Sequence, residues 1–462
     1  MAPMSARELF SRSRLDRRRL LRQTLLASAA AGGGILSARA QGGSTAEPWA
    51  TAPTADPPQK LVGVHWQYAA IYDSIYPKFE EDWGVPAEAI VAENVEPQVA
   101  RLAQMFAAGD QVDVSMCKHQ FLGSYIEQGL VQPIDDLPGA QAYIDDFTPF
   151  AQTTLQAQGK TWGLPYFATV WTNWYYEDKL DEAGIAAPFT SWDELVEQAQ
   201  KAKQDGVSTY PILWVAGVGS EQLPGTWFTL TWNRGGAMFD QDMTPLLGDG
   251  SVARETLKWW RQTFVDWEIS DPTSLEVRFI PAVQAFNSGD YLYHPITQHY
   301  YLTFANDPAA SPIAGKVKYF PMPGEGQSLG FADPYFLSAT TEHREWAWML
   351  LQALGGKDKD GEFATAKELA STAMLGSGYS SLTNSPFIAE AWGKWGNVDV
   401  VLQQWERSAS MVEAAPASTE PWFPNWLDQV NVHVQSCLRG EIDADQACEN
   451  LITAVDDAQQ SA

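Results

Sequence analysis

Strands and helices alternate along the first part of this chain, and this order limits the available folds most strongly. Residues 60–65 read KLVGVH, a short apolar run with β-branched residues, and helical spacing of apolar residues follows over 73–83. The order then repeats with the apolar run 89–92, a helix that starts near Glu96, and the run VDVSMC. Repeated strand–helix order is typical of a parallel sheet that helices cover on both faces. The sequence therefore predicts an α/β fold.

Later segments repeat these two patterns. The helix that starts near Glu96 ends at Gly109, because glycine readily adopts the backbone of a helix C-terminus. Ser191 and Glu194 predict a capping box, in which each side chain accepts a hydrogen bond from the other residue's backbone N–H. Apolar spacing predicts further strands over 209–215, 291–296, 317–321 and 335–337, and further helices over 120–128, 252–267, 280–286, 342–354, 387–395 and 444–457.

Length and charge exclude several classes of protein. A chain of 462 residues exceeds what one hydrophobic core usually supports, so two or more domains are expected. After residue 40 there are 22 basic and 55 acidic residues, a formal net charge of −33. Such a charge repels phosphate backbones and anionic lipid, which argues against a nucleic-acid partner or a membrane-surface role. Twenty tryptophans suggest that flat apolar faces serve more than core packing.

The N-terminus has the parts of an export signal. Residues 16–22 read DRRRLLR, an uncharged stretch follows over 23–37, and Ala-Arg-Ala ends at Ala40. We interpret 1–40 as a twin-arginine-type signal peptide that is cleaved after Ala40, which predicts a soluble periplasmic protein. Residues 41–59 are rich in Gly, Pro, Ala and Thr without periodicity, and we interpret them as a flexible leader.

Three cysteines are too few for a disulfide framework or a Cys-rich zinc site. Cys437 and Cys448 flank a turn-like Arg439-Gly440-Glu441 between two helical stretches, so they either pair across it or remain free. Cys117 ends an apolar run and is expected to be a buried thiol.

Four passages, in this order, resemble the extracellular solute-binding proteins of ABC importers, specifically the sugar-binding group that includes the maltose receptor. The first is VARLAQMFAAGDQVDVSMCKHQFLGSYIEQGLVQPIDDL, and the second is GKTWGLPYFATVWTNWYYEDKLDEAGIAAPFTSWDEL. The third is AFNSGDYLY, and the fourth, LRGEIDADQACENLITAVDDA, resembles the C-terminal helix pair of that family. Together the matching segments cover nearly all of 60–458.

The resemblance implies two α/β lobes, each a mostly parallel sheet flanked by helices, with a ligand cleft between them. Lobe one would comprise 60–168 and 300–340, and lobe two 169–299 and 341–462. The implied function is an extracytoplasmic substrate-binding protein that captures a carbohydrate or sugar derivative by hinge closure. It would deliver this small molecule to the membrane permease subunits of an ABC transporter, as a monomer and without a cofactor.

Candidate ligand contacts follow from the loops at the carboxyl ends of strands, which form the ligand crevice in open α/β sheets. Strand alternation places Trp171 on the cleft face of its strand and Trp174 on the core face. Each candidate has core packing, capping or solvation as its structural alternative. The candidates are Trp66, Gln67, Tyr68, Lys118, His119, Thr169, Trp171, Trp214, Trp232, Gln298, His299, Tyr300, Asp333 and Tyr335.

Enzyme motifs are scarce, and we identify no catalytic or metal-binding residues. The chain has no HExxH, GxxxxGK[ST] or GxSxG motif, and its six histidines lack paired metal spacing. One alternative is an exported carbohydrate-active enzyme, because glycosidases need only two carboxylates. Another is a binding protein for a charged solute. The tryptophan faces suit a cation, whereas Lys118 and His119 suit an anion.

Overall fold

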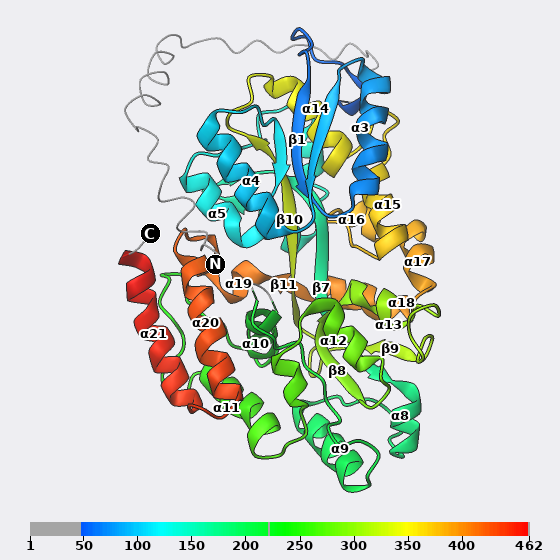
Figure 1. Cartoon of the computed structure of the whole chain (residues 1–462), viewed down its shortest axis with the longest axis vertical. Coiled ribbons are helices and arrows are strands. Elements are labelled where there is room, and N and C mark those ends of the chain that lie inside the picture. Colours follow the sequence, from blue (N-terminus) through cyan, green and yellow to red (C-terminus); the bar gives the residue numbers. More distant parts are fainter. Residues whose placement is uncertain (1–47, 220–221, 461–462) are drawn as a thin grey trace, which may run out of the picture.

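One mixed sheet runs through both lobes of the molecule (Figure 1). Within residues 48–219 and 222–460, which the computed structural model describes, nine strands form this sheet, with the central order β2-β1-β3-β10-β7-β8. Strands β4 (Val131–Gln132) and β11 (Ser408–Ser410) pair with β10, and β9 pairs with β7. The predicted two-lobed α/β fold is confirmed.

The first lobe follows the predicted strand–helix order. Strand β1 (Leu61–Trp66) pairs in parallel with β2 (Ala87–Ala92) and β3 (Val114–Met116). Helix α4 (Val95–Ala108) ends at Gly109, which has φ 72° and donates its N–H to carbonyls of the last turn. The helices that follow these strands are α3 (Ala69–Trp83), α4 (Val95–Ala108) and α5 (His119–Glu127).

Two long strands connect the lobes. Strand β7 (Leu164–Tyr176) pairs antiparallel with β10 (Ser328–Ser338) through its first half and with β8 (Tyr293–Gln298) and β9 (Val317–Phe320) through its second. The sheet is therefore more antiparallel than the strand–helix order alone predicts, because the chain returns across the junction between the lobes rather than through a helix.

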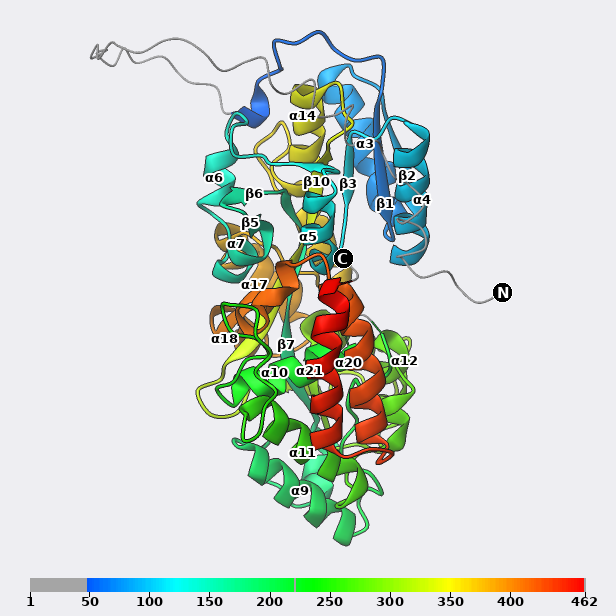
Figure 2. The ribbon, with the colours of Figure 1, turned by 90° about the vertical axis from the view of Figure 1, so that its left-hand side faces the viewer.

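The second lobe packs helices around β8, β9 and the end of β7. Figure 2 shows α20 and α21 side by side along this lobe. The strand predicted over 209–215 is wrong, because only Ile212 there forms isolated bridges, to Ser270 and Tyr293. The main helices of this lobe are α8 (Glu177–Glu182), α9 (Trp192–Gln204), α10 (Gln222–Asn233), α11 (Val252–Val265), α12 (Phe279–Phe286), α18 (Val398–Glu406), α20 (Phe423–Leu438) and α21 (Ala444–Gln460).

The capping box at α9 differs in one bond from its prediction. The Ser191 hydroxyl accepts from the Glu194 N–H at 3.1 Å, as expected. The Glu194 carboxylate instead accepts from the backbone N–H of Thr190 at 2.7 Å. Ser191 and Thr190 therefore both take part in hydrogen bonds at the start of α9, whereas the predicted capping box pairs Glu194 with Ser191 alone.

The predicted lobe boundaries need two corrections. Strand β9 lies within the range 300–340 that was predicted for lobe one, but it pairs with the second half of β7 in lobe two. Helices α14 (Arg344–Gly355) and α15 (Ala364–Ala373) were expected in lobe two, but both contact α3, and Figure 1 shows α14 beside α3 at the far end of lobe one. These helices follow β10, which runs back into lobe one before they begin.

The leader predicted over 41–59 is also wrong where the structure describes it. The Trp49 ring lies 6.0 Å from the Tyr143 ring, and Lys357 Nζ lies 4.3 Å from the centroid of the Trp49 ring. The Trp346 indole N–H donates to the Ala55 carbonyl at 3.0 Å. This segment is therefore docked on lobe one, while the predicted signal peptide over 1–40 lies outside the described residues.

The described helices include none long and apolar enough to cross a membrane.

Cys437 and Cys448 lie on the adjacent helices α20 and α21 as free thiols, so the bridge considered above is not formed in the structure. Both side chains are fully buried, and burial raises the pKa of each thiol to about 12. Cys117 is also free and buried, as predicted.

Because thiolates are the reactive species, we expect an aromatic disulfide reagent to label none of the three cysteines in the native protein. Unfolding without reductant should release three reactive thiols per chain, measured by absorbance. A count of one would instead show that Cys437 and Cys448 are bridged in the protein as isolated.

Candidate ligand site at the seam between the lobes

A buried ion pair lies where β3 and β10 meet α5. Lys118 follows β3 and stands at the N-terminus of α5, and its Nζ lies 3.0 Å from Asp333 Oδ2. The Lys118 side chain is 14% exposed and that of Asp333 is 0% exposed. The other carboxylate oxygen, Oδ1, accepts from the backbone N–H of His119 at 2.9 Å and lies 3.0 Å from its Nδ1.

Three aromatic rings surround the ammonium of Lys118. Its Nζ lies 5.9 Å from the Trp66 ring centroid, 5.4 Å from that of Phe167 and 5.8 Å from that of Phe331. These separations are within the range of cation–π attraction. We call Lys118, Asp333 and these three rings the Lys118 cage.

The carboxylate of Asp333 is held in its ionised form. Burial alone would raise the pKa of Asp333, but the charge of Lys118 and the hydrogen bonds from His119 outweigh it, so this pKa lies below its ordinary value. The cage therefore contains one positive and one negative charge that compensate each other.

A second group of polar side chains lies beside the cage. The Tyr300 hydroxyl donates to Gln298 Oε1 at 2.7 Å, and the Tyr300 ring lies 6.1 Å from that of Phe167. Gln298 Nε2 and the Tyr166 hydroxyl are buried and have no hydrogen-bond partner among the described residues. A buried donor without a partner costs about 1–3 kcal/mol. These two groups are therefore unsatisfied polar atoms beside the cage.

The backbone at the start of α3 is strained. Gln67 and Tyr68 have φ values of 53° and 48°, a left-handed conformation that non-glycine residues adopt at a cost. Burial raises the pKa of Tyr68, and the positive charge of Lys118 opposes that rise. This turn brings Tyr68 towards the Lys118 cage, while Gln67 remains exposed.

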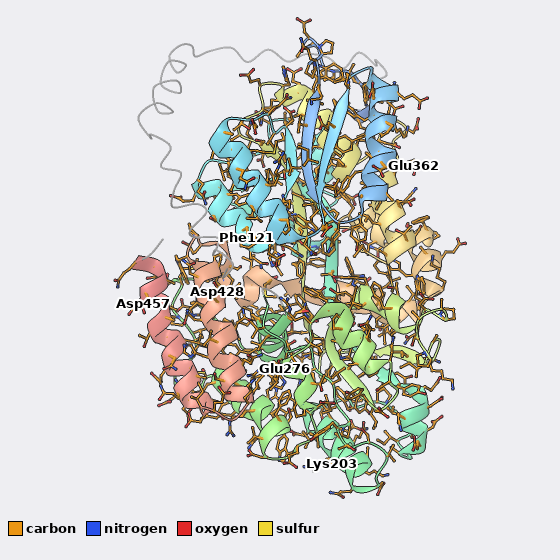
Figure 3. All side chains as sticks on the ribbon, in the orientation of Figure 1. Phe121, Lys203, Glu276, Glu362, Asp428 and Asp457 are labelled. Atoms are coloured by element: carbon orange, nitrogen blue, oxygen red, sulfur yellow. The ribbon has the colours of Figure 1, made fainter. Side chains whose placement is uncertain are left out.

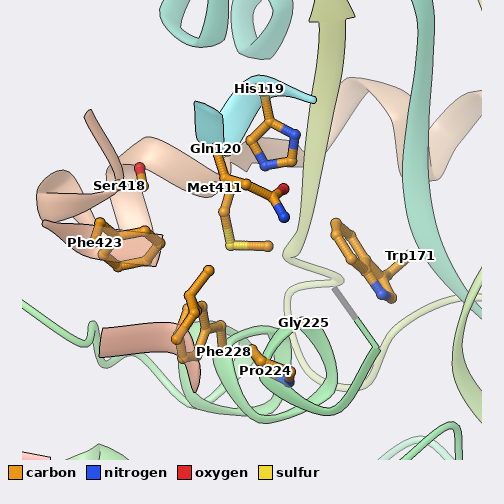
Figure 4. A pocket seen from close by; sticks show the side chains of 10 residues that line it. His119, Gln120, Trp171, Pro224, Gly225, Phe228, Met411, Ser418 and Phe423 are labelled. Carbon is orange, nitrogen blue, oxygen red and sulfur yellow. The ribbon is translucent and has the colours of Figure 1, made fainter. Parts of the chain in front are cut away.

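A cavity lies between the lobes on the other side of His119. It has a volume of about 20 Å³, room for roughly one water molecule. Figure 4 shows His119 and Gln120 of α5 on one side, Trp171 of β7 on another, and Phe228 of α10 below. The remaining lining residues are Pro224, Gly225, Met411, Ser418, Phe423 and Leu427.

We call the surface where α5 meets β7, α10 and the segment leading into α20 the seam. Two glycines allow close contacts at this seam. A Cβ at Gly225 would lie 2.7 Å from Trp171 Cζ2, so glycine lets α10 rest against that ring. A Cβ at Gly123 of α5 would lie 2.0 Å from the Thr419 carbonyl oxygen, in the segment that leads into α20. Helix α5 of lobe one contacts α20 and the segment before it, so the lobes touch in this form of the molecule, whose side chains are drawn in Figure 3.

The structure brings together about half of the residues predicted from sequence. Trp66, Tyr68, Lys118, Asp333, Gln298 and Tyr300 lie in or beside the Lys118 cage, His119 lies between the cage and the cavity, and Trp171 lines the cavity. Whether they contact a ligand stays a prediction.

Two predicted candidates have a structural role at the crossing between the lobes. The Thr169 hydroxyl lies 3.0 Å from His299 Nδ1, and His299 Nε2 lies 3.0 Å from the Met374 carbonyl oxygen. Both side chains are fully buried, and burial lowers the pKa of His299 to about 3. The neutral imidazole therefore connects β7, the end of β8 and the end of α15 instead of facing a cleft.

Three further candidates lie apart from the cage and the cavity lining. Trp214 is buried in the core of lobe two, where its indole N–H donates to Ser270 Oγ at 2.7 Å. Trp232 is part-buried near the end of α10. Tyr335 packs inside lobe one with its hydroxyl 3.0 Å from that of Tyr72. Apolar strand and helix patterns do not distinguish a core tryptophan from a cleft tryptophan.

Sequence reasoning missed residues from distant segments. Phe167 and Phe331 lie on strands whose pairing the sequence does not show, and Tyr166 precedes the stretch chosen from alternation. Phe228, Met411 and Phe423 come from helices with no visible signal of a site. Among the described residues, no group of three or more His, Cys, Asp or Glu side chains could hold a metal ion.

A family model described as bacterial extracellular solute-binding protein matches residues 66–360. This match covers more than half of the chain, so the chain belongs to that family.

Curated relatives match over shorter stretches. A protein of Brucella abortus (strain 2308) that is described as a binding protein is 32% identical over 114 residues, 24% of this chain and 26% of that protein. The maltotriose-binding protein of Pyrococcus abyssi is 28% identical over 134 residues, 28% of this chain and 27% of that protein. The chain therefore spans about a quarter of the length of these relatives.

Solved structures match over nearly the whole fold. An ABC transporter solute-binding protein from Agrobacterium radiobacter K84, in complex with ribitol, has a TM-score of 0.69 at 21% identity, covering 86% of this chain and 98% of that one. At this identity the likeness shows the two-lobed fold alone.

Trp174 offers a test of the strand register in β7. Its side chain is fully buried, its ring lies 5.3 Å from that of His294, and its indole N–H donates to Thr172 Oγ1 at 3.1 Å. We expect Trp174→Ala to lower the free energy of unfolding by about 3–5 kcal/mol, measured by chemical denaturation.

Trp171→Ala is the matched comparison on the same strand. Its ring is 3% exposed in this form of the molecule but lines the seam, so an open ligand-free form would expose it. The loss of stability should then be clearly smaller than for Trp174→Ala. Equal losses would show that Trp171 is a core residue.

Proposed function

We propose that this protein captures a sugar, polyol or sugar derivative at the seam between its lobes and delivers it to the membrane subunits of an ABC importer. The observation that carries the proposal is the arrangement at the seam. Buried Gln298 and Tyr166 leave polar atoms without partners beside the aromatic faces of Trp66 and Phe167. Hydroxyls and the CH face of a sugar complement such a site.

The similar proteins support a small polyhydroxylated ligand. The names of two of them mention maltotriose and ribitol, which share neutral charge and many hydroxyl groups. Compensated charge in the Lys118 cage suits a neutral ligand better than an ion. The proposal includes a periplasmic location, a monomeric state and the absence of catalysis, which fit a family of extracellular binding proteins.

Calorimetric titration tests this function. The mature protein is titrated with ribitol, mannitol, glucose, maltose and maltotriose, and the products are analysed after prolonged incubation. We expect stoichiometric binding of at least one of these compounds without turnover. Turnover would indicate the carbohydrate-active enzyme instead, and no binding across the panel would contradict a sugar or polyol ligand.

Trp171→Ala should weaken the binding of that ligand by about 2 kcal/mol or more, because an aromatic anchor at the centre of an interface contributes strongly to affinity. The matched control is Trp83→Ala. Trp83 is part-buried at the end of α3, where Lys359 Nζ lies 4.8 Å from its ring. Unchanged affinity in Trp171→Ala would place the ligand elsewhere.

Binding also requires the lobes to move. A seam cavity of about 20 Å³ cannot hold a sugar, so the lobes must separate for entry and then close on the ligand. We expect small-angle scattering to show a smaller radius of gyration with saturating ligand than without it. Confirmed binding with an unchanged radius would contradict this hinge motion.

Gly123→Ala provides the matched variant for the motion. The added Cβ would lie 2.0 Å from the Thr419 carbonyl oxygen, so the variant should not reach the closest approach of the lobes. Its radius with ligand should exceed that of the parent protein, and its affinity should fall. Gly84→Ala would not be a suitable control, because Gly84 has φ 69° and alanine is strained in that conformation. A Cβ at Gly248 would meet no atom within 4 Å. We therefore choose Gly248→Ala as the control.

A further inference from the structure

The Lys118 cage has the chemistry of a site for an ammonium ion. Three aromatic faces within 6 Å and a carboxylate oxygen at 3.0 Å surround Lys118 Nζ. Aromatic rings with a carboxylate are how proteins recognise alkylated ammonium ligands. Here the ammonium comes from the protein's own chain.

The buried carboxylate requires a cation at this position. Asp333 is fully buried, and Oδ1 already accepts from the His119 backbone and lies beside its imidazole. The remaining oxygen, Oδ2, lies against Lys118 Nζ. A buried charge without a partner is strongly unfavourable, so the cage is stable only when a cation occupies it.

The other lysine–ring contacts in the described ranges lack this combination. Lys203 lies 6.0 Å from the Tyr210 ring, and its carboxylate partner Glu268 is 69% exposed. Lys367 lies 5.5 Å from the Phe387 ring, and its partner Glu362 is 58% exposed. Only at Lys118 does the described structure join three rings to a fully buried carboxylate.

We propose that Lys118 is the built-in occupant of an ammonium site and thereby excludes cationic ligands from the seam. The mature chain carries a formal net charge of −33, which attracts cations to any open anionic pocket. With Lys118 in place, the cage has no uncompensated negative charge to offer them. Lys118 is therefore the residue that restricts the seam to neutral ligands, and this second part rests on the proposed function.

Truncation of the side chain tests the proposal. Lys118→Ala removes three carbons and the ammonium nitrogen, the heavy atoms of n-propylammonium. We expect n-propylammonium chloride to raise the melting temperature of Lys118→Ala saturably, by about 3 °C, relative to sodium chloride at equal ionic strength. The parent protein should show no such rise. Absence of a rise in folded Lys118→Ala would overturn the proposal.

Three controls distinguish binding of n-propylammonium in the Lys118 cage from stabilisation that does not depend on the cage. 1-Propanol has the same chain without the charge and should not stabilise Lys118→Ala. Lys203→Ala removes a surface lysine and should not respond to n-propylammonium. The double variant Lys118→Ala/Asp333→Asn lacks the carboxylate and should lose the response. A similar rise with 1-propanol, in Lys203→Ala or in the double variant would contradict an ammonium site formed by Asp333.

If Lys118→Ala does not accumulate in folded form, its refolding yield becomes the measurement. We expect n-propylammonium to increase that yield several-fold over 1-propanol, and equal yields would overturn the proposal. Neither measurement requires a sugar. Rescue without sugar binding would contradict only the proposed function, and sugar binding without rescue would contradict only the role of Lys118.

Discussion

Strand β7 is the constraint on which the arrangement of the molecule depends. Its 13 residues pair with β10 in lobe one and with β8 and β9 in lobe two, so one strand sets the position of both lobes. Residues along β7 have different roles. Phe167 is one ring of the Lys118 cage, Trp171 lines the cavity and Trp174 packs in the core of lobe two. Site, seam and core therefore share one backbone element.

The junction between the lobes combines a buried hydrogen-bonded connection with close contacts that can separate. Thr169 of β7, His299 after β8 and Met374 at the end of α15 form one hydrogen-bonded chain that is buried. Since His299 stays neutral over the ordinary pH range, this connection does not depend on pH. At the seam itself, the backbone of Gly123 approaches the Thr419 carbonyl, and Gly225 approaches the Trp171 ring. Close contacts of this kind separate without leaving charges unpaired.

Charge is distributed unevenly between the surface and the site. The chain carries a formal net charge of −27, yet the charged pair of the site, Lys118 and Asp333, is compensated and nearly enclosed. Long-range attraction would favour cations, whereas the cage presents no net charge to them. The local arrangement therefore opposes the field of the whole protein, as the proposed neutral ligand requires.

Strand–helix order, helix ends and family resemblance were readable from sequence because they depend on local spacing. The helix from Val95, its end at Gly109 and the resemblance to solute-binding proteins all follow from neighbouring residues. What the tertiary structure decided was which distant residues meet. Phe167 and Phe331 approach Lys118 because β7 pairs with β10 across more than 150 residues of chain. Trp214 is buried because Trp192 of α9 and Trp259 and Trp260 of α11 pack around it. Sequence spacing determines local structure, whereas strand pairing and packing determine a site.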